Sequence, residues 1–371
     1  MIYDIAVIGA GMAGASIAAE LAPHTRVVLL EAEDAPGYHA TGRSAAFWSE
    51  SYGGPGVVPL TRASGAYLAE RGVLTQRGAL YVGRAQDRGA MDAFRASYAG
   101  TGVEIEPFSP QALAARLPQL RPEWTEALYQ PACADIDVAG LHQHYQREAR
   151  RQGVEIVVRA RVAGLARVSG TDVWTITTER GESWRAAMIV NAAGAWADAV
   201  AQAAGVRPLG IAPFRRTLAV LRVEPPAPDD LPLVLDIGGG FYFKPDAGRL
   251  WLSPHDEIPS DPCDAAPEEW DVAIAIERFQ QVTDWPIAAV ERRWAGLRSF
   301  APDRLPVYGF DPEGAGFFWF AGQGGFGIQT APAAARLAAQ LLLGQGPDAM
   351  TAGIDAAAYA PARFAPALQS A

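Results

Sequence analysis

The chain opens with two apolar runs separated by a glycine-rich turn and an alanine-rich stretch. The first run, residues 3–8, leads directly into Gly9-Ala10-Gly11-Met12-Ala13-Gly14, and the second run, residues 27–30, ends at Glu31. A continuous apolar run, a G-x-G-x-x-G turn and a small-residue helix in this order predict a strand–turn–helix–strand unit. Such a unit is typical of dinucleotide-binding domains.

The glycines of this turn have distinct physical roles. Gly9 permits the tight turn, Gly11 lets the backbone approach a pyrophosphate, and Gly14 lets the helix pack closely on the sheet. The helix N-terminus offers free N–H groups to phosphates. Glu31, 22 residues after Gly9, lies where a carboxylate can accept hydrogen bonds from a ribose. The pattern predicts dinucleotide binding without choosing the dinucleotide.

The pattern further along the chain predicts a return to the same sheet. A strand is expected at 79–82, and Asp137 is expected to cap a helix that ends near Gly153. A β meander is expected at 154–160, 162–168 and 172–178. Apolar residues 187–190, followed by Asn191-Ala192-Ala193-Gly194 and a helix over 195–204, predict a second strand–turn–helix in the nucleotide sheet.

Residues 211–290 predict a different layer. Alternating strands are expected at 214–223, 233–237, 240–245 and 249–253, followed by an amphipathic helix over about 268–283. Within Phe241-Tyr242-Phe243-Lys244, the period of two places Tyr242 on one face of the sheet and both phenylalanines on the other.

A second glycine-rich segment, residues 322–327, precedes the last long helix. Thr330 is expected to cap this helix, with Pro332 in its first turn, Leu343 at its end and Gly344 as the stop. From composition alone the segment is either an ordinary glycine-rich loop or a helix N-terminus that faces a group intolerant of side chains.

Composition and charge narrow the class of protein. The chain has 371 residues, half of them apolar, and a formal net charge of −10. These values predict a globular protein and argue against nucleic acid or an anionic membrane as the main partner. No apolar stretch of membrane-spanning length is free of charged or Gln residues, and the first strand leaves no room for a signal peptide. A cytoplasmic location is expected, with peripheral membrane association left open. His142 and His144 face different sides of their helix, so no metal site is expected.

Four segments together resemble a known family. They are the N-terminal turn, Gly37–Phe47, residues 191–196, and residues 294–303 with 322–330. The chain resembles the D-amino-acid oxidase/glycine oxidase superfamily of FAD enzymes, most closely its D-arginine dehydrogenase branch. This resemblance implies an α/β (α+β) fold: a Rossmann-type FAD-binding domain and a substrate domain with a large, mostly antiparallel sheet. The FAD-binding domain would comprise 1–75, 135–210 and 291–371, and the substrate domain 76–134 and 211–290.

The resemblance also assigns cofactor contacts. FAD is expected to bind non-covalently, because no cysteine lies in the segments that would face the flavin. The expected contacts are Gly9, Gly11 and Gly14 with the pyrophosphate; Glu31 with the ribose; Val162 near the adenine; Thr41, Arg43, Ser44, Ala46, Gly194 and Trp196 along the cofactor; and Gly325, Gly327, Ile328, Gln329 and Thr330 at the isoalloxazine edge.

For the substrate, the resemblance points to Arg298 and Arg215 as cations for a carboxylate, with Tyr52 and Tyr242 as hydroxyl donors. A guanidinium can bind a carboxylate in a bidentate way, which fixes orientation as well as affinity. Phe47 and Ala79 stand where the arginine-oxidising branch has a histidine and a glutamate. Both changes remove polarity, so a cationic side chain on the substrate is not expected.

These observations predict an FAD-dependent oxidoreductase that oxidises a small, neutral or apolar D-amino acid. Hydride would pass to flavin N5, and the imino acid would hydrolyse to a 2-oxo acid and ammonia. The alternatives are a secondary amine (sarcosine, glycine or proline type), a 2-hydroxy acid, or a flavin-binding redox sensor or subunit of a larger oxidase. Either O2 or a quinone would reoxidise the flavin.

Overall fold

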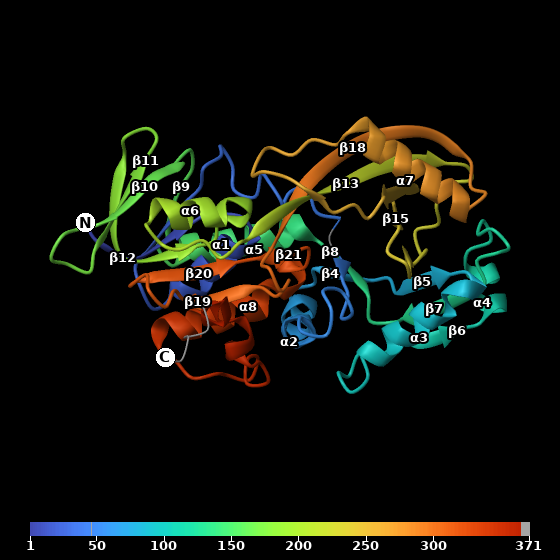
Figure 1. Cartoon of the computed structure of the whole chain (residues 1–371), viewed down its shortest axis with the longest axis horizontal. Coiled ribbons are helices and arrows are strands. Elements are labelled where there is room, and N and C mark those ends of the chain that lie inside the picture. Colours follow the sequence, from blue (N-terminus) through green and yellow to red (C-terminus); the bar gives the residue numbers. More distant parts are fainter. Residues whose placement is uncertain (46, 365–371) are drawn as a thin grey trace, which may run out of the picture.

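The computed structural model describes residues 1–45 and 47–364 (Figure 1). Two large sheets lie along the long axis of the molecule, and the long strands β13 (Ala212–Val223) and β18 (Ile287–Phe300) arch from one towards the other. This arrangement confirms the predicted fold class, a parallel nucleotide-binding sheet joined to a mostly antiparallel one.

The first sheet has eight strands. Its centre is parallel, with β1 between β12 and β2, while β10, β11 and β12 form an antiparallel extension. In spatial order the strands are β10 (Val162–Arg167), β11 (Trp174–Thr178), β12 (Ser183–Asn191), β1 (Tyr3–Ile8), β2 (Val27–Leu30) and β9 (Glu155–Val157); β20 (Phe317–Ala321) also pairs with β12, and β19 (Val307–Phe310) pairs with β20.

The second sheet has ten strands and is antiparallel except where β14 meets β5. In spatial order they are β21 (Gln323–Gly324), β18, β13, β16 (Arg249–Ser253), β15 (Tyr242–Asp246), β14 (Leu233–Asp236), β5 (Ala79–Gly83), β7 (Glu126–Gln130) and β6 (Glu106–Phe108), with β17 (Ile258–Pro259) on β13. A small third sheet contains β3 (Phe47–Trp48), β8 (Ala134–Ile136) and β4 (Leu74–Gln76).

Helices cover these sheets. The α-helices are α1 (Met12–Leu21), α2 (Val58–Glu70), α3 (Arg88–Ser97), α4 (Pro110–Arg116), α5 (Val138–Arg151), α6 (Ala197–Ala203), α7 (Glu269–Val282) and α8 (Gly327–Leu343), and short 3₁₀ turns lie at η1 (Ala85–Asp87), η2 (Gly194–Trp196), η3 (Ala356–Tyr359) and η4 (Pro361–Phe364). Among the described residues, no helix is long and apolar enough to span a bilayer.

Helices α1 and α8 pack on one face of the parallel sheet, and their small residues allow a close approach. Ile5 and Val7 of β1 point into this layer, whereas Ala6 and Ile8 point into the opposite core with α6. Such burial on both faces is expected of parallel strands and explains their continuous apolar sequence. On the second sheet, Phe243 packs under α7 against Phe279.

The predicted meander is wrong in one strand. Segment 155–157 does not pair with β10; it forms β9, which lies parallel to β2 at the far edge of the sheet. The cause is the crossover through α5, which delivers the chain beside β2 as a parallel strand. Glu31 N–H then donates to the Val157 carbonyl at 2.8 Å, so this edge borders the predicted ribose site.

The start of α8 also differs from the sequence prediction. Phe326, not Thr330, precedes the helix, and Thr330 lies in its first turn. Its N–H and its hydroxyl both donate to the Phe326 carbonyl, at 3.2 and 2.9 Å.

The Asp137 cap is confirmed by a 2.8 Å bond from Gly140 N–H to its carboxylate. Gly344 ends α8 in the left-handed conformation, as expected. The proposed domain boundary at 291 falls inside β18.

Candidate active site

One continuous cavity of about 650 Å³ runs from the β1–α1 turn to the ends of β13 and β18 and the start of α8. It therefore joins the two large sheets. Most of the predicted cofactor residues line one part of it and most of the predicted substrate residues the other, although they come from segments far apart in sequence.

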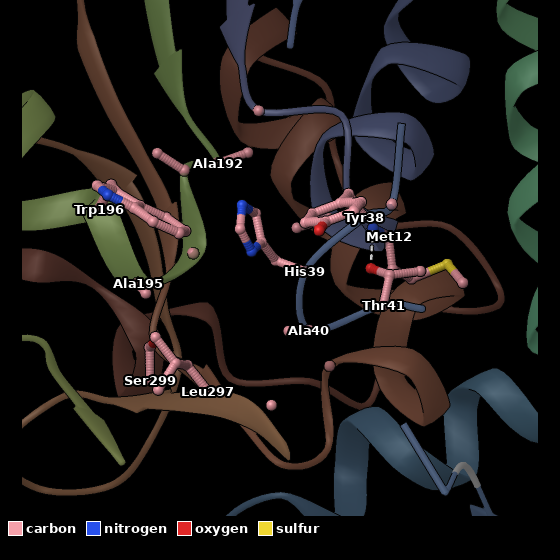
Figure 2. Close-up of a pocket in the computed structure, with 18 of the residues that line it drawn as sticks. Met12, Tyr38, His39, Ala40, Thr41, Ala192, Ala195, Trp196, Leu297 and Ser299 are labelled. Atoms are coloured by element: carbon pink, nitrogen blue, oxygen red, sulfur yellow. Dashed lines mark hydrogen bonds between the residues drawn. The ribbon is translucent and has the colours of Figure 1, made fainter. Parts of the chain in front are cut away.

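The β1–α1 turn forms one end of the cavity. Gly9 has φ +95°, and a Cβ there would lie 2.6 Å from the Ala192 carbonyl oxygen. A Cβ on Gly14 would collide with the Gly9 carbonyl, because α1 crosses the turn closely at this point. Met12 N–H at the start of α1 donates to Thr41 Oγ1 at 2.9 Å, which fixes the loop over the helix N-terminus (Figure 2).

Glu31 lies at the end of β2 and is oriented from two sides. Its Oε2 accepts from Ala10 N–H at 2.8 Å and its Oε1 from Glu33 N–H at 2.9 Å. Each carboxylate oxygen can still accept another hydrogen bond. Val162 lines the same end of the cavity. The geometry suits a ribose and adenine.

The middle of the cavity has an aromatic wall. Trp196 and Gly194 of η2 line it from one side, and His39 lies between Trp196 and Tyr38 (Figure 2). His39 Nε2 is 3.0 Å from Glu33 Oε1, and its ring centroid is 4.7 Å from that of Trp196. These contacts give His39 a packing role.

Arg43 ties the loop to the neighbouring sheet. Its Nη1 donates to the carbonyls of Ala265 and Ala295 at 2.7 and 3.3 Å, and its Nη2 pairs with Asp264. Its guanidinium is therefore bonded to protein groups, although Arg43 is among the residues that line the cavity, as is Ser44. Ala46, also expected at the cofactor, lies outside the described residues.

The glycine-rich segment before α8 lines the cavity where β18 ends. Gly325, Gly327, Ile328 and Gln329 all border it, but the described lining does not include Thr330, which is buried. The side-chain amide of Gln329 donates to the Tyr52 carbonyl at 3.1 Å and to Thr61 Oγ1 at 2.9 Å. These bonds join α8 to the segment that carries Tyr52.

Arg298 and Tyr52 meet at the far end. Arg298 Nη2 donates to the Tyr52 hydroxyl, and Nη1 lies 3.2 Å from Glu257 Oε1. A Cβ on Gly325 would collide with both side chains, so this glycine is required by their close approach. Burial, with Arg304 nearby, lowers the pKa of Arg298 to about 9, so the guanidinium remains charged at neutral pH.

The structure places Arg215 away from the cavity, contrary to the prediction. Its guanidinium pairs with Glu268 and with Asp271, the latter at 2.9 Å, whereas Arg216 lines the cavity. The cause is strand register. Phe214 pairs with Arg298 across β13 and β18, and residues that pair across an antiparallel ladder share a face. Arg216, two residues from Phe214, is therefore on the face of Arg298.

Tyr242 and Phe47 complete this end. The centroid of Phe47 lies 5.3 Å from that of Tyr52 and 6.0 Å from that of Tyr242. Burial raises the pKa of Tyr242, which keeps its phenol protonated and able to donate. Trp48 is turned away, and its indole N–H donates to the Thr61 carbonyl at 3.1 Å.

Among the described residues that line this end of the cavity, none is acidic. The acidic ones are Glu31, Glu33 and Glu179, all near the β2 end of the cavity. Ala79 is buried in β5 and does not line the cavity. Glu50 pairs with Arg62 at 3.2 Å.

Sequence reasoning did not find Arg216, Glu257 or Arg304. Arg216 lies on the same face of the sheet as Arg298. The sequence can show this only when the pairing register of β13 against β18 is known. Glu257 lies in a connection without a motif, and Arg304 is outside the cavity; nothing in the sequence marks either residue.

Three features of the cavity fit FAD. They are the glycine-rich turn at the N-terminus of α1, the carboxylate of Glu31, which Ala10 N–H orients, and the second glycine-rich helix start at the far end. The residues expected to hold the cofactor, apart from Gly14, Thr330 and the undescribed Ala46, line this one space.

Comparisons with known proteins agree with this geometry. Glycine oxidase of Pseudomonas aeruginosa is 28% identical over 253 residues, 67% of this chain and 65% of that protein. L-2-hydroxyglutarate dehydrogenase of Escherichia coli is 27% identical over 227 residues, 57% of this chain and 53% of that protein. The matches thus span between about half and two thirds of these relatives.

Solved structures share the fold over almost the whole chain. L-proline dehydrogenase from P. horikoshii superposes with a TM-score of 0.84 at 22% identity, covering 98% of each chain. Glycine oxidase from Geobacillus kaustophilus gives a TM-score of 0.79 at 23% identity, covering 93% of this chain and 95% of that one.

The FAD dependent oxidoreductase family, DAO, matches residues 4–341. The match includes both glycine-rich helix starts, Glu31 and the strands that carry Arg216, Tyr242 and Arg298. The chain therefore belongs to the DAO family of FAD-dependent oxidoreductases, and FAD is its cofactor.

Proposed function

We propose that this enzyme dehydrogenates a small amino acid that carries one carboxylate, and that neutral or apolar D-amino acids are its best substrates. The observation that carries the proposal is the meeting of Arg298 and Tyr52 beside Gly325. A buried cation and a hydroxyl lie there against the helix start expected at the flavin edge.

Arg298 would bind the substrate carboxylate, with Arg216 as the second cation in place of Arg215. Tyr52 and Tyr242 would donate hydroxyl hydrogen bonds to it. A fixed carboxylate limits the orientation of the substrate, and orientation is what transfer of the Cα hydrogen requires. Tyr52 is itself fixed, because Arg298 bonds its hydroxyl and Gln329 bonds its carbonyl.

The side chain of the substrate would face an aromatic surface. Phe47 contacts Tyr52 and Tyr242, and Leu218 also lines this region. A substrate guanidinium or ammonium would lose hydration here without gaining a carboxylate partner. This supports preference for apolar over cationic side chains.

FAD, when bound, supplies the acceptor for the substrate's hydride. The described side chains at this end offer cations and phenols but no carboxylate or imidazole base in the cavity. The substrate amine would therefore have to react in its neutral form. Tyr242, held protonated by burial, would act as a donor and not as a base.

A small amine-bearing carboxylate of the sarcosine, glycine or proline type is the second candidate. It is favoured by the relatives, which include glycine oxidase of Pseudomonas aeruginosa and mitochondrial sarcosine dehydrogenase of Homo sapiens, the latter 24% identical over 267 residues. A small secondary amine would leave the Phe47 surface uncovered, whereas a branched or aromatic D-amino acid would bury it.

The test is anaerobic mixing of the purified flavoprotein with D- and L-amino acids, sarcosine, glycine, proline and 2-hydroxy acids, followed by flavin bleaching. Neutral D-amino acids should bleach the flavin without an added protein partner. If only sarcosine, glycine or proline bleached the flavin, the second candidate would replace the first. Bleaching only by 2-hydroxy acids, or by none, would refute it.

A further inference from the structure

Three arginines converge on one carboxylate behind the substrate end of the cavity. Glu257 Oε1 lies 3.4 Å from Arg216 Nη2 and 3.2 Å from Arg298 Nη1. Arg304 Nη2 donates to Glu257 Oε1 at 2.9 Å and to Oε2 at 2.8 Å. Arg216 and Arg298 line the cavity, whereas Glu257 and Arg304 do not. Glu257 therefore binds both cavity arginines from outside the space that a substrate would occupy.

A second carboxylate neutralises the same cluster. Asp256 gives its backbone carbonyl to Arg216 Nε at 2.6 Å, and its side chain lies 3.7 Å from that nitrogen. Thr217 holds this side chain through its N–H and its hydroxyl, at 2.8 and 2.9 Å. The cluster thus contains three guanidinium groups, those of Arg216, Arg298 and Arg304, and two carboxylates, those of Asp256 and Glu257, and its net charge is +1.

The other titratable groups nearby are neutral, paired or bonded to the backbone; Arg278, close to His255, donates to the Gly240 and Pro254 carbonyls and does not line the cavity. Burial, with Arg216 nearby, lowers the pKa of His255 to about 4, so the imidazole is neutral at pH 7. Lys244 shares the Tyr242 face of β15 but is bonded to Asp135 at 2.8 Å and does not line the cavity. Arg43 is paired with Asp264.

We propose that Glu257 determines specificity: it limits the arginine cluster to the charge of a single carboxylate, so that the site accepts monocarboxylates and discriminates against dicarboxylates. The inference deepens the proposed function, on which its substrate class rests. It also predicts that a dicarboxylic 2-hydroxy or amino acid is a poor ligand of this enzyme.

Binding of inert acids tests the idea without turnover. Valerate and glutarate have the same number of carbon atoms but one and two carboxylates. Their affinities for the FAD-loaded enzyme are measured by titration calorimetry. The wild type should prefer valerate. Glu257→Gln should raise the glutarate/valerate affinity ratio about tenfold, because the cluster then carries a second net positive charge at close range. The gain should shrink at high salt.

Glu291→Gln is the matched control. Glu291 also bridges two arginines, Arg222 at 3.4 Å and Arg249 at 2.8 Å, and its side chain is as exposed as that of Glu257, 34% against 33%. It lies outside the cavity lining, so its ratio should equal that of the wild type. Arg304→Gln, which removes a cation, should move the ratio in the opposite direction and keeps the test decisive if Glu257→Gln does not fold.

An unchanged ratio in Glu257→Gln, an equal change in Glu291→Gln, or equal weakening of both acids would overturn the inference. The last result would make Glu257 a support for the arginines only. An enzyme that shows the expected ratios but oxidises no amino acid would refute the proposed function and leave the charge limit standing.

Discussion

At the scale of single residues, the substrate end depends on side chains whose charge and position are set by their neighbours. The side chain of Arg298 is only 13% exposed, donates a hydrogen bond to Tyr52 and packs against Gly325, so its guanidinium has little freedom. A lysine could carry the same charge, but it lacks the planar fork that binds two carboxylate oxygens.

We therefore expect Arg298→Lys to lower kcat/KM for the best substrate. One charge-assisted hydrogen bond is worth about 1.5–3 kcal/mol, which is roughly a tenfold to hundredfold loss. The FAD content should stay at the wild-type level, because the residue lies away from the β1–α1 turn. Steady-state kinetics and the absorbance ratio of flavin to protein measure the two. An unaltered kcat/KM would remove Arg298 from the site.

The lowered pKa of His255 leads to a separate prediction about how the free energy of unfolding depends on pH. Its folded pKa is lowered to about 4, mainly by burial, while an unfolded histidine titrates near 6.5. Between these values the unfolded chain binds the proton and the folded chain does not. Stability must therefore fall as the pH falls through this window. After allowance for partial exposure, the loss is about 1–2 kcal/mol.

The variant His255→Asn should weaken this acid destabilisation. Asparagine tolerates the positive φ of +56° at this position, and its amide can donate to the Gly239 carbonyl that His255 Nδ1 contacts at 3.0 Å. Urea unfolding at pH 7 and pH 5 gives the comparison, with the exposed His24→Asn as control. If both variants keep the wild-type difference between the two pH values, His255 is not responsible.

At the scale of elements, the sequence correctly predicts those features that neighbouring residues determine. The β1–α1 turn, the Asp137 cap and the position of Tyr242 on the face of β15 opposite the phenylalanines all depend on a few adjacent residues, and the structure has them. Arg216 could not be chosen over Arg215, because that choice depends on the register of β13 against β18. The edge position of β9 likewise follows from a crossover, which no adjacent residue encodes.

Helix α1 provides a test of close packing. A Cβ at Gly14 would meet the Gly9 carbonyl, so Gly14→Ala must displace α1 from the turn that we expect to hold the pyrophosphate. We expect loss of FAD and a lower melting temperature.

Gly89→Ala is the matched control, since Gly89 lies in α3 and a Cβ there meets nothing within 4 Å. It should be stabilised by about 0.5–1 kcal/mol, the usual gain for alanine over glycine in a helix. Normal FAD content in Gly14→Ala would contradict the packing argument.

At the scale of the whole molecule, one cavity connects the two large sheets, so the cofactor would tie them together. Of the two cysteines, Cys133 is buried among the residues packed around Ala79, whereas Cys263 is exposed and lines the cavity, so Cys263 is the one candidate among the described residues for a covalent flavin bond. We expect the β1–α1 turn, Glu31 and the glycine-rich start of α8, and not a covalent bond, to hold the cofactor.

We expect FAD to be released by acid precipitation, with a colourless pellet and a yellow supernatant. Added FAD should also raise the melting temperature of the depleted protein, because a ligand that binds only the folded state stabilises it. A yellow pellet would show a covalent flavin.

The central claim is that Arg298 and Tyr52 bind the substrate carboxylate beside the apolar surface of Phe47. One set of rates tests this claim most directly. The measurement is kcat/KM for D-leucine, D-methionine and D-phenylalanine against D-arginine, at matched pH and salt. The account predicts that kcat/KM for each neutral substrate exceeds that for D-arginine, because the described residues that line the substrate end of the cavity offer no acid to a desolvated guanidinium. An advantage of D-arginine of about tenfold or more, which corresponds to roughly 1.4 kcal/mol, would contradict it.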